Sequence, residues 1–215
     1  MEEYIKGYCE DFEFSQTEQI FQTVSGIDIN IDIFEAWKEI NGLKHYREKA
    51  FVALTKGEKT YECVFYDEHN YKYLFFSVTI KEKSYLLFRK TLYGFTLLDT
   101  DTLTETYNYI PENIKNGEES FIITGVNQLG ELLIFDGCYW AAPYECYVYD
   151  YEKKLFANVS TALGVDSLEE IEIKDDTLYL SGDVFSDDDE SKRIQKTVSA
   201  KELDKLISEN GVKEI

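Results

Sequence analysis

The chain of 215 residues is long enough to bury a core of its own, and this length is typical of one domain or of one domain with an appendage. Its 42 acidic residues outnumber the 22 basic ones, and the formal net charge of -20 argues against nucleic acid and anionic membranes as partners, because both would be repelled. A basic protein partner is compatible with this charge, although the same excess would also keep a tyrosine-rich chain in solution.

The aromatic residues and the cysteines indicate the fold class and the compartment. With 17 Tyr and 14 Phe, the composition favours pleated, half-buried sheets, so we expect a mostly β protein. No segment is apolar over the length needed to cross a bilayer, and the acidic N-terminus lacks the features of a secretory signal. We therefore expect a cytoplasmic protein with reduced thiols at Cys9, Cys63, Cys138 and Cys146.

Residues 1–49 are expected to form a segment of short helices and one strand that packs on the sheets of a repeated β domain over 50–215. Ser15 followed by Glu18 has the form of a capping box, which predicts a helix over 16–24.

The segment GIDINI then alternates isoleucine with polar residues, as a strand with one buried face does. Asp32 and Glu35 predict the cap of a second helix in IFEAWKEIN, and Gly42 can end this helix in a left-handed conformation.

From residue 50 onward, short apolar runs separated by turn signals predict strands. The expected strands are Ala50 to Thr55, Thr60 to Tyr66, Tyr71 to Ile80, Tyr85 to Phe88, Phe95 to Asp99, Glu105 to Tyr109, Phe121 to Gly125, Leu132 to Phe135, Cys146 to Tyr151, Leu155 to Val159, Glu170 to Ile173, Leu178 to Leu180 and Arg193 to Val198. A second capping box, at Ser199 and Glu202, predicts a C-terminal helix that Gly211 can end.

Several of these strands form a repeating unit. The second strand of each unit begins near Ser84, Glu131 and Thr177, which are 47 and then 46 residues apart. The apolar strand that ends in Asp, as in FTLLDTDT and YVYDYEKK, resembles the third strand and following turn of a WD40-like propeller blade over about residues 71–200. The Gly-His and Trp-Asp pairs of that family are absent, so the resemblance implies a fold and no functional residue. We expect either a propeller-like arrangement or meandering antiparallel sheets.

The sequence predicts neither a metal nor a cofactor. Asp28, Asn30, Asp32 and Glu39 have the spacing of a calcium loop, but Ile33 occupies the position that requires glycine. The two histidines, His45 and His69, lack the spacing of zinc ligands. Glycine-rich phosphate loops and the nucleophile elbow are absent as well, and paired carboxylates are unremarkable among 42 acidic residues, so the chain is expected not to be an enzyme.

The segment FDGCYWAAPYECYVYDY, residues 135–151, is the richest in chemistry. A hairpin centred on Ala142 would place Cys138 opposite Cys146, within near reach of a disulfide. The acidic neighbours Asp136 and Glu145 would keep both thiols protonated and inert.

The connection within this hairpin contains Tyr139, Trp140, Pro143 and Tyr144. These rings are either an exposed contact surface or a plug folded over the end of the sheet.

We expect a non-enzymatic module that binds a basic partner protein, as an inhibitor or an immunity-type antagonist. In a propeller the like-numbered connections of three units share one face, which predicts a binding site made of Tyr93, Asp136, Tyr139, Trp140, Tyr144, Asp187 and Asp188. The alternatives are a carbohydrate-binding or glycoside-processing protein, which would use Trp140 and Tyr144 with a carboxylate pair, and a structural module of a larger assembly.

Overall fold

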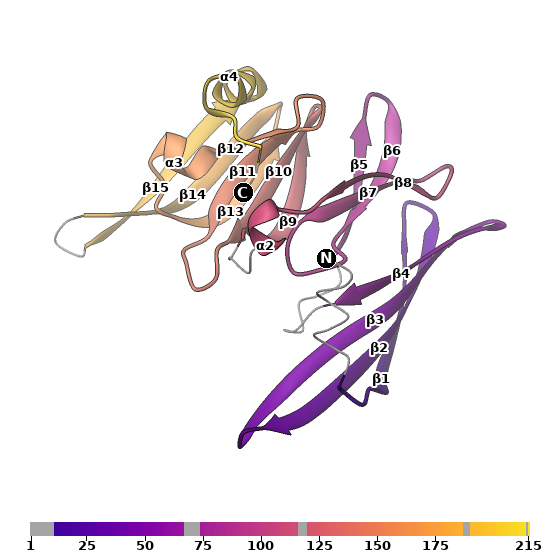
Figure 1. Cartoon of the computed structure of the whole chain (residues 1–215). Coiled ribbons are helices and arrows are strands. Elements are labelled where there is room, and N and C mark those ends of the chain that lie inside the picture. The colour runs from indigo at the N-terminus through magenta and orange to yellow at the C-terminus, as the bar shows by residue number, and fades with distance from the viewer. Residues whose placement is uncertain (1–10, 67–73, 116–119, 187–189, 214) are drawn as a thin grey trace. The chain divides into compact units, whose positions relative to one another are not determined.

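A computed structural model describes residues 11–66, 74–115, 120–186, 190–213 and 215, except for the side chains of residues 113 and 115. Contacts within the chain divide it into two compact units, Met1–Ile110 and Pro111–Ile215. Each unit contains antiparallel sheets whose neighbouring strands follow one another in the chain, as Figure 1 shows. The expected mostly β class is therefore confirmed.

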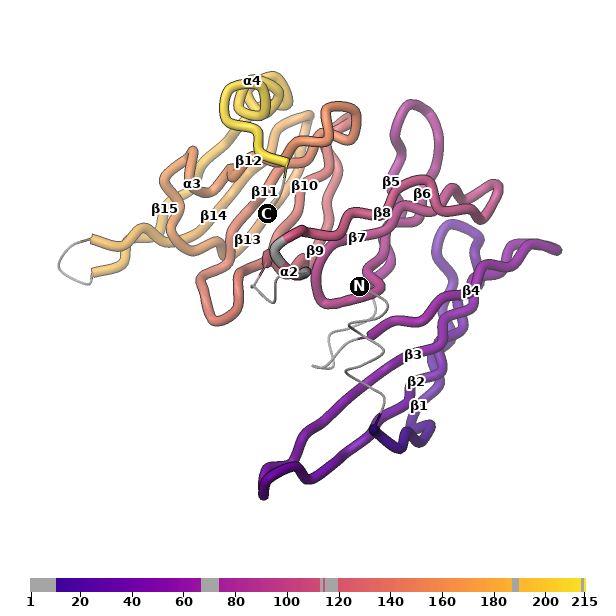
Figure 2. The backbone as a smooth tube through the Cα atoms, in the orientation of Figure 1, coloured from indigo at the N-terminus to yellow at the C-terminus, as the bar shows by residue number. Residues whose placement is uncertain are grey.

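The first sheet of the first unit has the strand order β1-β2-β3-β4. Its strands are β1 (Ser15–Val24), β2 (Ile27–Ile40), β3 (Leu43–Lys56) and β4 (Lys59–Tyr66). Strand β3 runs through residues 49 and 50, where we expected a boundary between segments. The end of the β2–β3 hairpin extends past the last paired residues of β1 and β4 (Figure 2). Trp37 and Leu43 lie in this part of the hairpin and are exposed.

Both N-terminal helices predicted from the sequence are wrong, because residues 15–24 and 27–40 form strands β1 and β2. The alternation of buried isoleucines continues through Ile33, which is the period of a strand and not of a helix. A capping box is a local signal, and here the ladder between β2 and β3, which runs from Asp28 to Ile40, overrides it.

The residues assigned to helix caps have other roles in this sheet. The Asp32 carboxylate accepts hydrogen bonds from the amides of Gln16 (3.1 Å) and Gln19 (2.6 Å) on the neighbouring strand. Asn41 and Gly42 both have positive φ, at 54° and 79°, and form the tight turn between β2 and β3. The left-handed conformation predicted for Gly42 is thus confirmed, but this residue lies in a hairpin turn and not at the end of a helix.

The second sheet of the first unit has the order β5-β6-β7-β8. Its strands are β5 (Phe75–Ile80), β6 (Lys83–Phe88), β7 (Phe95–Asp99) and β8 (Thr104–Tyr109). The two sheets share one core, formed by Ile27, Ile29, Ile31, Ile33, Ala50, Val52, Leu54, Phe65, Leu86, Phe88, Leu98 and Leu103. A backbone hydrogen bond of 2.8 Å from Tyr66 N to Lys90 O also joins them.

The described residues of the second unit form two sheets and three helices. Its first sheet, of order β12-β11-β10-β9, consists of β9 (Ile122–Leu129), β10 (Leu132–Cys138), β11 (Glu145–Asp150) and β12 (Leu155–Asn158). Its second sheet consists of β13 (Ser167–Lys174), β14 (Thr177–Phe185) and β15 (Ser191–Ser199). The helices are α2 (Glu112–Lys115), α3 (Val159–Leu163) and α4 (Ala200–Asn210).

Helix α4 confirms the C-terminal prediction. The Ser199 side chain accepts from Glu202 N while the Glu202 side chain accepts from Ser199 N, so the capping box is complete. Leu203 and Ile207 of this helix are fully buried. They join the core of the second unit, which also contains Leu129, Leu132, Ile134, Cys146, Val148, Ala157, Val159, Leu168, Leu178, Leu180 and Val198.

The aspartates that end the third strands have the same role in two sheets. Asp99 Oδ1 accepts from the backbone N–H groups of Asp101 (2.8 Å) and Thr102 (2.9 Å). Asp150 Oδ1 accepts from those of Glu152 (2.8 Å) and Lys153 (3.0 Å). Each aspartate thus organises the turn into the fourth strand. The expected second strands are β6, β10 and β14, while the propeller arrangement stays a prediction.

Among the residues that the structure describes, no helix has the length and apolar character needed to span a bilayer.

Candidate functional site

Residues 139–144, which connect β10 to β11 in the second unit, are called the aromatic loop below. Strands β10 and β11 pair up to Gly137 and Glu145, so the two ends of the loop are held at the end of the sheet. Within the loop, Ala142 N donates to Tyr139 O at 3.0 Å, and Ala141 has a φ of 59°. The loop is therefore an ordered turn.

Tyr139 is the anchored residue of this loop. Its ring packs edge-on against Phe121 at 5.6 Å between ring centroids, and its hydroxyl lies 3.4 Å from that of Tyr147. Burial and this hydroxyl contact raise the pKa of Tyr147. Tyr139 thus has the packing expected of a plug.

The rest of the loop, residues 140–144, is exposed. Trp140 and Tyr144 each expose 45% of their surface. At the far end of the loop, Leu168 N donates to Tyr144 O at 2.8 Å, which attaches the loop to strand β13. Tyr139, which packs inward, therefore fits the interpretation of the loop as a plug. Trp140 and Tyr144, which lie on the surface, fit the interpretation as an exposed contact surface.

Acidic residues lie close to the attachment of the loop. Asp166 is exposed two residues before Leu168, its N–H donates to Asp183 O at 2.9 Å, and its carboxylate accepts from Phe185 N at 2.7 Å. Glu145, at the end of the loop, accepts from Asn158 Nδ2 at 2.7 Å.

The other predicted acidic residues do not join this surface in the part of the chain that is described. Asp187 and Asp188 lie outside the described residues. Asp136 is half-buried on β10, where its carboxylate accepts from Thr124 Oγ1 at 3.0 Å. Burial raises the pKa of Asp136.

The predicted pairing of Cys138 with Cys146 is wrong. Strand β10 pairs Asp136 with Cys146 and Gly137 with Glu145, so the hairpin is centred on Ala141 and not on Ala142. Because the shift moves every partner by two residues, Asp136 takes the place expected for Cys138. Burial, and then the charge of Asp136, raise the pKa of Cys146, so this thiol is unreactive.

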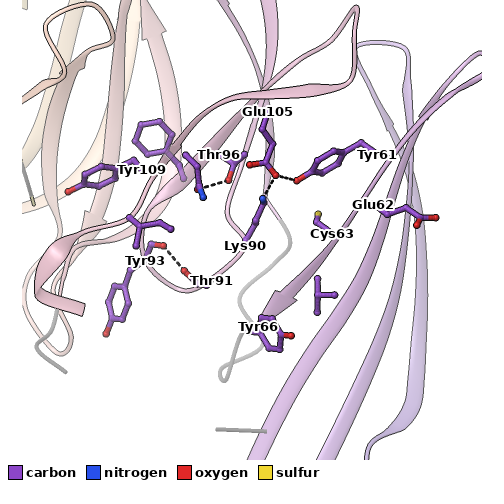
Figure 3. Close-up of a pocket in the computed structure, with 14 residues that line it drawn as sticks. Tyr61, Glu62, Cys63, Tyr66, Lys90, Thr91, Tyr93, Thr96, Glu105 and Tyr109 are labelled. Carbon is purple, nitrogen blue, oxygen red and sulfur yellow. Dashed lines mark hydrogen bonds and ion pairs between the residues drawn. The ribbon is translucent and has the colours of Figure 1, made fainter. Parts of the chain in front are cut away.

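A pocket with a volume of about 510 Å³ lies in the first unit and is called the tyrosine pocket below (Figure 3). One wall comes from β4, and the other comes from the β6–β7 connection with parts of β7 and β8. Four tyrosines line it, namely Tyr61, Tyr66, Tyr93 and Tyr109.

Two features of the chain shape the second wall. Gly94 has a φ of 79°, and a Cβ atom there would lie 2.2 Å from Tyr109 O, so the chain can turn this closely only at a glycine. Thr91 Oγ1 donates to Tyr93 O at 2.7 Å, which holds the connection in its bend.

The polar part of the pocket is a cluster of Lys90, Glu105 and Tyr61, in which the Glu105 carboxylate accepts from both partners (Figure 3). Burial would raise the pKa of Glu105, but the hydrogen bonds from Lys90 and Tyr61 outweigh it and lower this pKa. Burial raises the pKa of the neighbouring Cys63 to about 12, so its thiol stays protonated at neutral pH.

Tyr93, which we expected beside the aromatic loop, lines the tyrosine pocket of the first unit. Its grouping with Trp140 in the other unit stays a prediction. Sequence reasoning missed Lys90, Glu105 and Tyr61, since the ion pair joins residues 15 apart and the tyrosine comes from a different sheet. The only signal was the density of tyrosines in strands and connections.

No cluster of three or more metal-ligating side chains occurs among the residues that the structure describes. Comparisons with family models, with curated proteins and with solved structures find no match to the chain.

Proposed function

We propose that this chain is a non-enzymatic interaction module that binds a basic partner protein through the aromatic loop. The observation that carries the proposal is the exposure of the unbroken run 140–144, in which Trp140 and Tyr144 are both 45% exposed. Exposed Trp and Tyr side chains on an ordered loop supply large contact area at little cost in side-chain entropy.

Charge complementarity determines the class of partner. The chain carries a net charge of -20. Glu145 directly follows the loop, and Asp166 lies two residues before Leu168, whose N–H donates to the loop. An acidic surface speeds the approach of a basic protein, while the rings slow its departure. Tight binding by a small acidic module suits an inhibitor or an immunity-type antagonist.

Protein binding explains the loop better than carbohydrate binding does. A saccharide site encloses its ligand between side chains, whereas every residue from 140 to 144 is exposed. The nearby carboxylates of Glu145 and Asp166 accept hydrogen bonds within the fold.

The proposal includes a cytoplasmic setting and blade-like units related to WD40 propellers. The free thiols of Cys63, Cys138 and Cys146 support the first. The shared turns at Asp99 and Asp150 support the second.

The test compares partner capture from native lysate by the wild-type chain, by Trp140→Ala and by a control, Tyr179→Ala, which removes a 39% exposed ring elsewhere in the second unit. The captured protein is then purified and its affinity measured at low and high salt. We expect a basic protein whose binding is lost in Trp140→Ala, kept in Tyr179→Ala and weakened by salt. Equal capture by all three chains, or a partner that is not basic, would refute the proposal.

A further inference from the structure

The tyrosine pocket is a second site, and the proposed partner binding does not use it. Its volume of about 510 Å³ lies within the range of pockets that hold small molecules, about 300–1,000 Å³. Both walls belong to the first unit, and the Tyr66 N to Lys90 O hydrogen bond of 2.8 Å joins them. The pocket is thus part of the fold of that unit.

The pocket offers ring surface on several sides. Tyr61 and Tyr66 come from β4, while Tyr93 and Tyr109 come from the opposite wall (Figure 3). Phe95 packs against Tyr109 at 5.5 Å between ring centroids, which fixes the position of that ring. A tyrosine presents an apolar face and a hydroxyl at once, so these walls suit a ligand that is both apolar and rich in hydroxyl groups.

Three charged residues line the pocket, and two of them, Lys90 and Glu105, are paired with each other. The third, Glu62, points away from this pair (Figure 3). Lys90 binds Glu105, and the two side chains are 24% and 32% exposed, so both still reach the pocket. Tyr61 donates to the same carboxylate. Near them, Thr96 Oγ1 donates to Asn108 Oδ1 at 3.0 Å, which orients the amide of Asn108. The polar lining therefore has little net charge, although it is rich in donors and acceptors.

This pairing excludes three classes of ligand. An anion would have to displace Glu105 from Lys90 against a chain charge of -20. A cation would meet the ammonium of Lys90. A wholly apolar ligand would remove water from Lys90 and Glu105 without replacing its hydrogen bonds, which is costly.

We propose that the tyrosine pocket binds a neutral saccharide of one or two sugar rings. The C–H faces of such a ligand stack on the tyrosine rings, and its hydroxyl groups exchange hydrogen bonds with Glu105, Lys90 and Asn108. A hydroxyl group can both donate to the carboxylate and accept from the ammonium, so it binds an ion pair without breaking it.

The test uses the full chain and an array of neutral mono- and disaccharides, with sialic acid as an anionic probe and tetramethylammonium as a cationic one. The best neutral saccharide is then titrated by calorimetry. Glu105→Gln removes the charged acceptor and should weaken binding about tenfold or more. Glu58→Gln is the matched control, since it makes the same change in an exposed residue of the first unit that does not line the pocket.

Two further variants keep the test decisive. Asn108→Asp keeps the oxygen that accepts from the buried Thr96 hydroxyl and removes the amide donor, so it gives a second answer if Glu105→Gln lowers the thermal midpoint of the chain. Trp140→Ala should leave saccharide affinity unchanged, which separates this site from the aromatic loop. Salt should also have little effect on the affinity.

The inference is overturned if no neutral saccharide binds, or if only sialic acid or tetramethylammonium does. It is also overturned if binding survives both pocket variants, or is lost in Trp140→Ala. Loss of partner capture by Trp140→Ala with intact saccharide binding would support both proposals independently.

Discussion

The connections 89–94 and 139–144 have equal length and the same place in their sheets, between the second and third of four strands. Every residue of 89–94 is buried or half-buried, whereas every residue of 140–144 is exposed. The first connection pairs with β4 through Tyr66 and becomes a wall of the tyrosine pocket. The end of the aromatic loop is tied to β13 by the Leu168 N to Tyr144 O hydrogen bond.

This difference shows that the exposure of a connection depends on whether another element of the fold covers it. Both connections contain aromatic residues, one in 89–94 and three in 139–144. A neighbouring strand makes the first connection a wall of the tyrosine pocket, while residues 140–144 of the second remain exposed.

The largest loss of unfolding free energy is expected for a substitution directly before the connection 89–94. Phe88, the last residue of β6, is fully buried, and its ring lies 5.6 Å from those of both Phe65 and Phe75. Phe88→Ala should lower the free energy of unfolding by about 3–5 kcal/mol, measured by urea denaturation. Phe21→Ala, which removes a 70% exposed ring from the same unit, should change it by no more than about 0.5 kcal/mol. Similar losses in both variants would contradict the assigned core.

An intermediate loss of stability tests whether the two sheets that contain these connections, β5–β8 and β9–β12, are equivalent. Asp99→Ala and Asp150→Ala each leave two turn N–H groups without their acceptor, and each should cost about 1 kcal/mol of unfolding free energy, as the loss of a helix cap does. Asn at either position keeps the acceptor oxygen and should restore most of the loss. If only one of the two alanine substitutions lowered the free energy of unfolding, the two turns would not be equivalent.

The Asp99 turn also predicts a pH dependence. The N–H of Thr102 holds the pKa of Asp99 below its usual value, so the folded state favours the charged form. The resulting stabilisation is complete above the pKa of the unfolded chain and is lost as pH falls through the lower, folded value. The difference in thermal midpoint between wild type and Asp99→Ala should therefore shrink below about pH 4.

The smallest effect is expected at Asp136, near the start of the aromatic loop. Burial raises its pKa, so its stabilising contribution is present at low pH and is lost as pH rises through the folded value. Asp136→Asn removes this charge, and its amide oxygen can still accept from Thr124. The variant should have a slightly higher thermal midpoint than wild type at pH 7 and no advantage at pH 4. A lower midpoint at pH 7 would show that the fold needs the charged carboxylate.

Local signals predicted much of the fold. The predicted strands whose residues are described all coincide with observed ones, since alternation and turn residues act within a few positions. The capping box of Ser199 and Glu202, which predicted the C-terminal helix, is an equally local signal. The predicted helices at 16–24 and in IFEAWKEIN failed because a capping signal cannot register that a partner strand lies alongside.

The candidate sites were only half predictable. The rings of the aromatic loop were found from their place in a connection, but the Cys138–Cys146 pair failed through an error of one residue in the centre of the hairpin. The tyrosine pocket was not found, because it depends on how β4 lies against a connection much later in the chain.

By itself the sequence determined the β class, the strand positions from residue 50 onward, the aspartate turns and the acidic charge, all of which depend on residue type and short-range order. Only the tertiary structure decided which connection is covered and where a pocket forms. Tyr61 and Glu105, which meet in that pocket, are 44 residues apart. Contacts at such separations depend on the packing of whole sheets, and no local pattern encodes them.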